Sequence, residues 1–146
     1  MSRIKIELPE TFSFSTHIPV QVRDINYGGH LGNDSLVSLL HEARIRYLQS
    51  LGCSELDACG TGLIMSDLAV TYKGEGFRGD ELLVEIAAGE FSSRGFDLLY
   101  RVGCRRETGT ILIATAKTGM LCFDYSTRKV AALPGELREK LEVGKG

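Results

Sequence analysis

The chain has 146 residues, of which 43% are hydrophobic and 25% are charged. These fractions are typical of one globular domain with a buried core, so we expect a single domain over residues 1–146. The formal net charge is −2, and the basic residues are spread along the sequence. The sequence therefore gives no cluster of positive charge that could bind a polyanion. This argues against nucleic acid as a partner.

The N-terminal stretch Met1–Pro9 alternates charged and apolar residues, without the continuous apolar run of a signal peptide. No stretch reaches the roughly 18 apolar residues that a membrane-spanning helix needs. Four cysteines, at positions 53, 59, 104 and 122, form no CxxC pair and no ligand set with the three histidines. We therefore expect free, mostly buried thiols, no metal, no membrane partner and a cytoplasmic location.

The first predicted strand begins at Phe12. Uncharged residues recur at alternate positions as far as Val22, which is the period of a strand with one buried face. Pro19 has no N–H group to donate, so it predicts an edge or a bulge. If the alternation continues past Pro19, Asp24 is the next inward-facing residue. Since burying an unpaired carboxylate is costly, a carboxylate at this position is a candidate for chemistry.

A glycine-rich turn, Tyr27–Gly32, separates this strand from a long amphipathic helix. Asn33 or Asp34 can cap the helix by accepting hydrogen bonds from the amides of its first turn. Apolar residues then recur three or four positions apart, which predicts a helix over 34–51 that ends at Gly52. The apolar arc covers nearly half of the circumference, so we expect a deeply embedded helix.

The remainder of the chain is dominated by strands. Charged, glycine-rich loops typical of hairpins separate four expected strands, at residues 63–73, 81–91, 96–104 and 110–124. Pro134 predicts a short terminal helix through about Leu141. The expected class is α+β, an antiparallel sheet of about five strands wrapped around one long helix. One helix leaves half of such a sheet poorly covered, so we expect the chain to associate with itself.

The segment from Asp24 to Arg44 resembles the 4-hydroxybenzoyl-CoA thioesterase-like branch of the hotdog superfamily. That family has the approximate pattern D-x-N/D-x-x-G-H-V-N-N, followed by a helix with a Glu-Ala-Arg group. This chain matches the pattern with Asp24, Asn26, Gly29, His30, Asn33, Glu42, Ala43 and Arg44. It departs from it at Leu31, which replaces valine, and at Gly32, where many members have the first asparagine. No role of that asparagine is carried over to this chain.

The resemblance implies a hotdog fold and hydrolysis of an acyl-CoA thioester to a free acid and coenzyme A. We expect a short-chain, medium-chain or aromatic acyl group, with coenzyme A as part of the substrate and no further cofactor. A homodimer or homotetramer is also implied. The chain is too short for the doubled hotdog of plant acyl-carrier thioesterases, which favours CoA over acyl-carrier protein.

Asp24 is the foremost catalytic candidate. Thioester hydrolysis needs an attacking water or carboxylate and donors for the charge that develops on the carbonyl oxygen. Asp24 could act as nucleophile or as general base, and the amides near Gly32 and Ser35 could polarise the carbonyl. The alternative is that Asp24 forms an Asx-type turn or caps the following loop.

Three further residues are candidates for the reaction. His30 could tune Asp24, bond the thioester or move a proton, or it could be a loop histidine satisfied by the backbone. Asn33 is a catalytic candidate because it matches the asparagine at the end of the family pattern. Glu42 is a second carboxylate, but it falls on the polar side of the helical wheel, which points to solvent or a subunit boundary. Arg44 falls inside the apolar arc, where we expect it to pair with an acid.

Substrate contacts are expected from the same motif and from later loops. The motif supplies Tyr27, Gly29, Leu31 and Gly32, with glycines that let a substrate approach the backbone closely. Basic residues in or beside loops could contact the phosphates of coenzyme A, namely Lys73, Arg78, Arg94, Arg105 and Arg106. For each aromatic residue, packing in the core is the alternative to lining an acyl pocket.

Two other functions fit the sequence. A hotdog enoyl-CoA hydratase uses an Asp and a His close together in a D-x-N-P-x-H loop, and the segment Asp24–His30 is similar, although it lacks the proline and has its histidine one position later. A non-catalytic acyl-CoA-binding protein is the other alternative. Sensors of that kind normally carry an output module, for which this chain has no spare segment.

Overall fold

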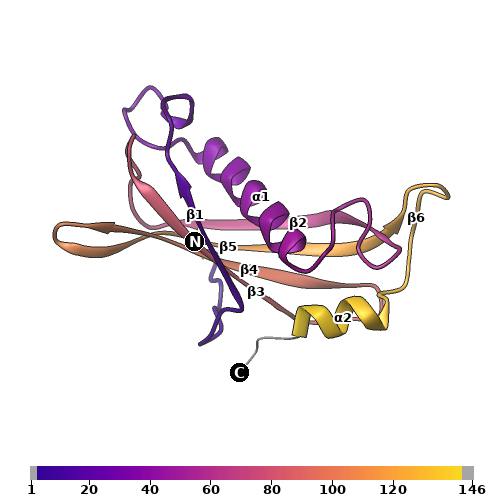
Figure 1. Ribbon diagram of the computed structural model, residues 1–146. Helices are drawn as coiled ribbons and strands as arrows, with labels where there is room; N and C mark the ends of the chain where they lie inside the picture. The colour runs from indigo at the N-terminus through magenta and orange to yellow at the C-terminus, as the bar shows by residue number, and fades with distance from the viewer. Residues whose placement is uncertain (1–2, 143–146) are drawn as a thin grey trace.

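The computed structural model describes residues 3–142 (Figure 1). Its elements are, in chain order, β1 (Phe14–Pro19), the 3-10 turn η1 (Val22–Asp24), α1 (Asn33–Ser50), β2 (Gly62–Tyr72), β3 (Glu81–Gly89), β4 (Gly95–Arg106), β5 (Gly109–Asp124), β6 (Lys129–Val130) and α2 (Gly135–Glu142). No helix within this range is long and apolar enough to cross a membrane.

The strands form one antiparallel sheet. Its order is β1-β3-β4-β5-β2, and β6 pairs with β5. Figure 1 shows α1 lying across one face of the sheet. The predicted architecture of a sheet with one long helix is therefore confirmed. The short strand β6 was not predicted, because a two-residue strand has too few positions to show an alternation.

The core lies between α1 and the sheet face that it covers. The helix contributes buried apolar residues at three- and four-residue steps, namely Leu36, Leu40, Ala43, Tyr47 and Leu48. Alternate residues of β3 and β4 face them, namely Leu82, Val84, Ile86, Leu98, Tyr100 and Val102. Each large apolar side chain buried in this way contributes about 1.5–3 kcal/mol to folding. The helix–sheet contact therefore fixes where the start of α1 lies on the sheet.

The start of α1 differs from the prediction. Gly32 is the N-cap residue, without a capping side chain, and Asn33 is the first helical residue. Asn33 does not cap the helix from the N-cap position. Its side-chain oxygen instead accepts a hydrogen bond from the backbone N–H of the next residue, Asp34, at 2.8 Å. The prediction of an Asn33 or Asp34 cap was wrong by one position, because glycine can also occupy an N-cap.

The alternation of β1 does not reach Asp24. Strand β1 ends at Pro19, and although Val20 is buried, Val22 is 72% exposed. The chain turns in η1, where the Asp24 carboxylate accepts a hydrogen bond from the backbone N–H of Gln21 at 2.8 Å. The inward direction predicted for Asp24 was therefore wrong, because the proline ends the strand and a local turn replaces it.

Arg44 pairs with an acid inside the fold, as predicted. Its guanidinium donates to the Glu55 carboxylate at 3.2 Å and to the Tyr100 hydroxyl at 3.3 Å. The Tyr100 hydroxyl must then donate to Thr118 Oγ1, 2.8 Å away. Burial lowers the pKa of Arg44, but Tyr100 and Glu55 outweigh it, so the pKa is raised overall. A polar network thus joins α1 to the centre of the sheet.

The strand β2 is one of the two edges of the sheet, and β1 is the other. Its large apolar side chains are more than one-third exposed at four positions, Ile64, Met65, Leu68 and Tyr72. The register of β2 against β5 shifts at a bulge between Met65 and Asp67. Exposed apolar side chains along an unpaired edge agree with the expectation that this chain associates with itself.

Alanine is expected to be harmful at one glycine of β4 and tolerated at another. A Cβ atom at Gly95 would collide with the carbonyl oxygen of Met120, whereas one at Gly103 would meet no atom closer than 3.5 Å. Gly95→Ala is therefore expected to lower the free energy of unfolding by about 1–3 kcal/mol through overpacking. Gly103→Ala is expected to change it by less than about 0.5 kcal/mol. Urea denaturation measures both, and equal losses would contradict the geometry.

Candidate active site

The loop before α1 is held by its own backbone. The Asn26 N–H donates to the His30 carbonyl at 2.9 Å, and the Asn26 side-chain oxygen accepts from the Gly28 N–H at 2.9 Å. Gly29 has a φ of 81°, a conformation that favours glycine. The Leu31 N–H donates to the Gly76 carbonyl at 2.7 Å, which joins this loop to the one after β2. The motif residues are therefore held in place around the start of α1.

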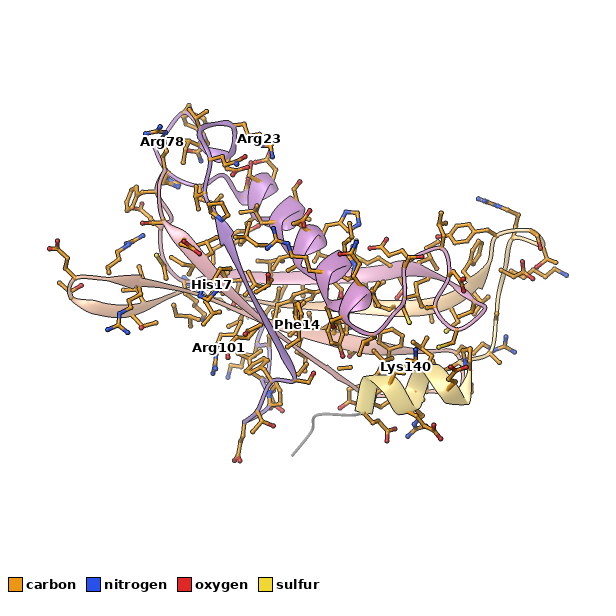
Figure 2. All side chains as sticks on the ribbon, viewed as in Figure 1. Phe14, His17, Arg23, Arg78, Arg101 and Lys140 are labelled. Atoms are coloured by element: carbon orange, nitrogen blue, oxygen red, sulfur yellow. The ribbon has the colours of Figure 1, made fainter. Side chains whose placement is uncertain are left out.

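The start of α1 presents unused hydrogen-bond donors. The Gly32 N–H donates to the Asp24 carbonyl at 2.9 Å, but the N–H groups of Asn33 and Ser35 have no acceptor within residues 3–142. Unpaired amides and the helix dipole together favour negative charge at this end. Figure 2 shows Arg23 and Arg78 at the same end of the molecule. This end can therefore stabilise an anionic group or an oxygen that gains negative charge.

A first cleft, called cleft A below, opens beside the start of α1 and the end of β2. It has a volume of about 890 Å³ and is lined by Asn26, Tyr27, His30, Leu31, Asn33, Asp34, Tyr72, Lys73, Gly74 and Glu75. Five residues that the sequence singled out are thus brought together: Tyr27, His30, Leu31, Asn33 and Lys73. Tyr27 is fully exposed, so core packing, the alternative for this aromatic, is wrong.

The tautomer of His30 follows from its contacts. Its Nδ1 lies 3.2 Å from the Leu31 carbonyl oxygen, which can only accept, so Nδ1 carries a proton. In the neutral imidazole Nε2 is then the acceptor. The Glu75 carboxylate lies 4.0 Å from Nε2, and both side chains are partly exposed in cleft A. His30 can therefore accept a proton at Nε2 and donate it from there.

Tyr72 and Asp34 line cleft A but were not predicted as site residues. The Tyr72 hydroxyl donates to the Asn33 carbonyl at 3.0 Å. Burial, and after it the charge of Asp34, raise the pKa of Tyr72. The sequence showed Tyr72 as the last alternating residue of its strand, but not that this strand ends beside the helix start.

A second cleft, called cleft B below, lies on the other side of the helix start. It has a volume of about 540 Å³ and is lined by Ile18, Pro19, Gln21, Arg23, Asp24, Ser35, Ser38, Leu39, Glu42 and Arg46. Both candidate carboxylates, Asp24 and Glu42, lie here. Glu42 is exposed, as its place on the helical wheel predicted, and accepts from the Arg46 guanidinium at 2.8 Å.

Three predicted binding residues do not line either cleft. Gly29 and Gly32 shape the loop and cap the helix. Arg94 lies at the other end of the sheet, where its guanidinium donates to the Val130 carbonyl at 3.2 Å. Tyr72 pairs with Ala114 and Gly95 pairs with Leu121, so about 24 Å of strand separates Arg94 from cleft A at roughly 3.4 Å per residue. Within one chain, Arg94 therefore lies outside cleft A.

The side chains within residues 3–142 include no group of three or more His, Cys, Asp or Glu that could hold a metal ion. The thiols of Cys53, Cys59, Cys104 and Cys122 are free, and three of the four are buried, as the sequence predicted.

The sequence matches the family model of the Thioesterase-like superfamily over residues 20–141. The chain belongs to this superfamily. The match covers cleft A, all of cleft B except Ile18 and Pro19, and the chain from α1 through β6. No curated protein matches the chain significantly.

Several solved structures share the fold of this superfamily member. Slr0204 from Synechocystis, a 1,4-dihydroxy-2-naphthoyl-CoA thioesterase, is 22% identical with a TM-score of 0.77, over 88% of this chain and 94% of that one. YbaW from Escherichia coli, a probable thioesterase, is 24% identical with a TM-score of 0.73, over 90% and 98%. SAV2348 from Staphylococcus aureus, solved in complex with CoA, is 17% identical with a TM-score of 0.77, over 93% and 85%. These likenesses confirm the hotdog architecture.

Proposed function

We propose that this thioesterase-superfamily protein hydrolyses an acyl-CoA to a free acid and coenzyme A at the start of α1. The observation that carries the proposal is the pair of unused amides, on Asn33 and Ser35, between two clefts that hold a carboxylate and an imidazole. The names of Slr0204, which acts on an acyl-CoA, and of SAV2348, which was solved with CoA, support this substrate class.

The proposed reaction uses the amides for the carbonyl oxygen and Asp24 for the attack. As a general base, Asp24 takes a proton from water while the water oxygen bonds to the thioester carbon. The carbon–sulfur bond then breaks and coenzyme A leaves as a thiolate. As a nucleophile, Asp24 bonds to that carbon itself, and water hydrolyses the resulting anhydride. The thiolate needs little help from an acid because thiol pKa values lie near 8.5.

Cleft A is the proposed binding site for the rest of the substrate. Its volume falls within the range of about 300–1,000 Å³ that is usual for small-molecule sites. His30 and Asn33 face the thioester in this arrangement, and Tyr27 and Leu31 contact the acyl group. Lys73 lies at the same cleft, where it contacts a phosphate of coenzyme A. A short-chain, medium-chain or aromatic acyl group is the proposed substrate class.

The experiment that tests this function measures thiol release from a panel of acyl-CoAs, from acetyl to palmitoyl with benzoyl and phenylacetyl. Release at enzymatic rates from at least one of them is the expected result. Binding of every acyl-CoA without thiol release would favour the non-catalytic alternative. Hydration of crotonyl-CoA without thiol release would favour the hydratase. The hydratase has less support, because the segment Asp24–His30 lacks the proline of the hydratase loop and has its histidine one position later.

We also propose that the free edge of β2 pairs with β2 of a second copy. A two-fold axis at the bulge near Asp67 would set Tyr72 of one chain opposite Gly62 of its partner. The partner's Arg94 would then lie at the same end of the joint sheet as cleft A. In such a dimer Arg94 of the second copy can contact the phosphates of coenzyme A.

Met65→Asp tests this dimer. Because Met65 is 41% exposed beside the bulge, the change adds a charge at the proposed contact without emptying the core. The mass measured by sedimentation equilibrium is expected to fall to half of the wild-type value. The matched control is Leu56→Asp, which adds the same charge at a more exposed apolar residue outside β2. An unchanged mass for Met65→Asp would rule out this edge.

A further inference from the structure

The loop between β2 and β3, residues 73–80, forms part of cleft A. Its first three residues line the cleft. One of them, Glu75, carries the carboxylate that lies 4.0 Å from His30 Nε2. The Gly76 carbonyl accepts a hydrogen bond from the Leu31 N–H at 2.7 Å. The position of this loop therefore decides how Glu75 faces His30.

The same loop holds the end of the strand that leads to Asp24. The Asp80 carbonyl accepts from the Val20 N–H at 2.8 Å, and the Gly79 N–H donates to the Val20 carbonyl at 3.0 Å. Val20 lies between two residues that line cleft B, and the η1 turn that carries Asp24 follows it. A shift of the loop would therefore move the backbone on both sides of the start of α1.

One side chain of β4 fixes this loop. Nη2 of Arg106 donates to the Glu75 carbonyl at 2.7 Å and to the Asp80 carboxylate at 2.5 Å. The guanidinium carbon lies 5.0 Å from the centre of the Phe77 ring. The Asp80 carboxylate also accepts from the Phe77 N–H at 2.8 Å. Arg106 thus contacts the loop near its start, at its middle and at its end.

The ion pair between Arg106 and Asp80 is partly shielded from solvent. The two side chains are 27% and 18% exposed, so water and salt screen this pair less than a pair at the surface. A hydrogen bond between charged groups is also stronger than a neutral one. The N–H groups of Lys73 and Gly74 donate to the Ile113 carbonyl, but they hold only the start of the loop. The rest of the loop is expected to loosen when Arg106 is removed.

We infer that Arg106 is a positioning residue for the proposed reaction. Through the loop it fixes Glu75 beside His30 in cleft A and the backbone that leads to Asp24 in cleft B. The inference rests on the proposed function and gives Arg106 no contact with the substrate, since Arg106 lines neither cleft. The sequence made Arg106 a candidate for contacting a phosphate of coenzyme A. Its contacts within the chain assign it to the loop instead.

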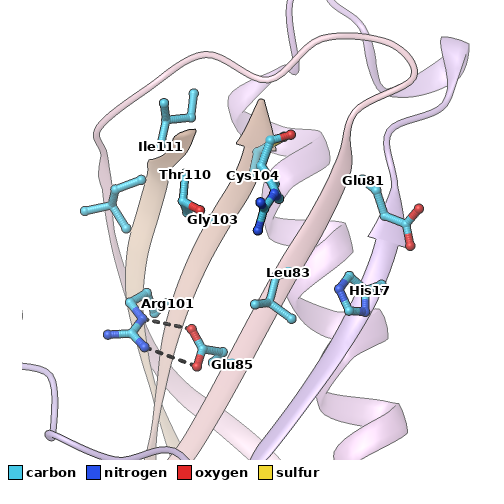
Figure 3. A pocket seen from close by; sticks show the side chains of 11 residues that line it. His17, Glu81, Leu83, Glu85, Arg101, Gly103, Cys104, Thr110 and Ile111 are labelled. Atoms are coloured by element: carbon cyan, nitrogen blue, oxygen red, sulfur yellow. Dashed lines mark hydrogen bonds and ion pairs between the residues drawn. The ribbon is translucent and has the colours of Figure 1, made fainter. Parts of the chain in front are cut away.

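Arg101 is the matched control on the same strand. Its guanidinium donates to the Glu85 carboxylate at 2.9 and 3.1 Å, and its carbon lies 4.6 Å from the centre of the Phe12 ring. Figure 3 shows the pair of Arg101 and Glu85, with α1 behind the strands. Neither residue lines cleft A or cleft B. Arg101→Met therefore removes the same kinds of contact as Arg106→Met, but at a place that does not reach the loop.

Amide hydrogen exchange, followed by NMR in the full-length protein, reports on the loop directly. The N–H groups of Val20 and Leu31 both donate to carbonyls of the loop, so their exchange follows its opening. Arg106→Met is expected to speed exchange at both amides by about 10-fold to 10²-fold, the effect of losing a charge-assisted hydrogen bond. Arg101→Met is expected to leave both rates unchanged. Unchanged rates in Arg106→Met, or equal increases in the two variants, would overturn the inference.

Thiol release tests the link from position to reaction. With the acyl-CoA that the wild type hydrolyses fastest, Arg106→Met is expected to lower kcat/KM by about 10-fold to 10²-fold, the cost of a misplaced site. KM rises because cleft A is disturbed, and kcat falls because the backbone before Asp24 shifts. Arg101→Met is expected to keep both constants, even where the two variants lose the same stability. Full kcat/KM in Arg106→Met together with faster amide exchange would show a purely structural contact and overturn the positioning role.

A second variant tests whether Arg106 acts through Asp80. Asp80→Asn removes the charge but keeps an oxygen that can accept from the Phe77 N–H. It is expected to reproduce the faster exchange, and adding it to Arg106→Met is expected to change little, because residues in one contact are not additive. Additive effects would contradict the pair. A wild type that releases no thiol contradicts the proposed function, whereas unchanged exchange in Arg106→Met contradicts the contact with the loop alone.

Discussion

Replacing Asp24 with asparagine is expected to lower kcat for thioester hydrolysis by about 10²–10⁴-fold, the usual contribution of a general base. Asparagine keeps a side-chain oxygen that can accept from the Gln21 N–H, so the turn η1 is retained. Binding of a non-hydrolysable thioether analogue of acyl-CoA should therefore survive. Thiol-release kinetics and isothermal titration calorimetry measure the two quantities.

A matched control exists elsewhere in the chain. Asp57 also accepts a backbone N–H, from Gly60 at 3.0 Å, and lies outside both clefts. Asp57→Asn is expected to leave kcat unchanged. If Asp24→Asn also keeps full kcat while Asp24→Ala lowers stability by the roughly 0.5–2 kcal/mol of a lost cap, Asp24 is a capping residue and not a catalytic one.

Replacing Glu55 with alanine is expected to lower the free energy of unfolding by about 3 kcal/mol. Arg44 would keep a charge that is only 6% exposed while losing the carboxylate that pairs with it. Breaking one side of a buried ion pair costs about 3–5 kcal/mol, and the 29% exposure of the Glu55 side chain places this pair at the lower end. Urea denaturation followed by circular dichroism measures the loss.

Two other variants test the cause of that loss. Glu42→Ala removes a carboxylate from an exposed pair on the same helix, and less than about 1 kcal/mol is expected. Arg44→Met removes the buried charge itself and is expected to cost less than Glu55→Ala, because no uncompensated charge remains. Equal losses for Glu55→Ala and Glu42→Ala would show that the network does not stabilise the fold.

The sequence by itself determined the elements and the family. The spacing of apolar residues located α1 to within one residue and the four long strands to within two residues at each end. The helical wheel also predicted an exposed Glu42 and a buried, paired Arg44. These features depend on local periodicity, which a sequence records directly.

Only the tertiary structure decided how the candidate residues are grouped. The alternation of β1 pointed Asp24 inward, but Pro19 ends the strand and the η1 turn carries Asp24 to cleft B, away from His30. Tyr72 joins cleft A because β2 ends beside the start of α1. Such groupings depend on contacts between residues far apart in the chain, and no local pattern encodes them.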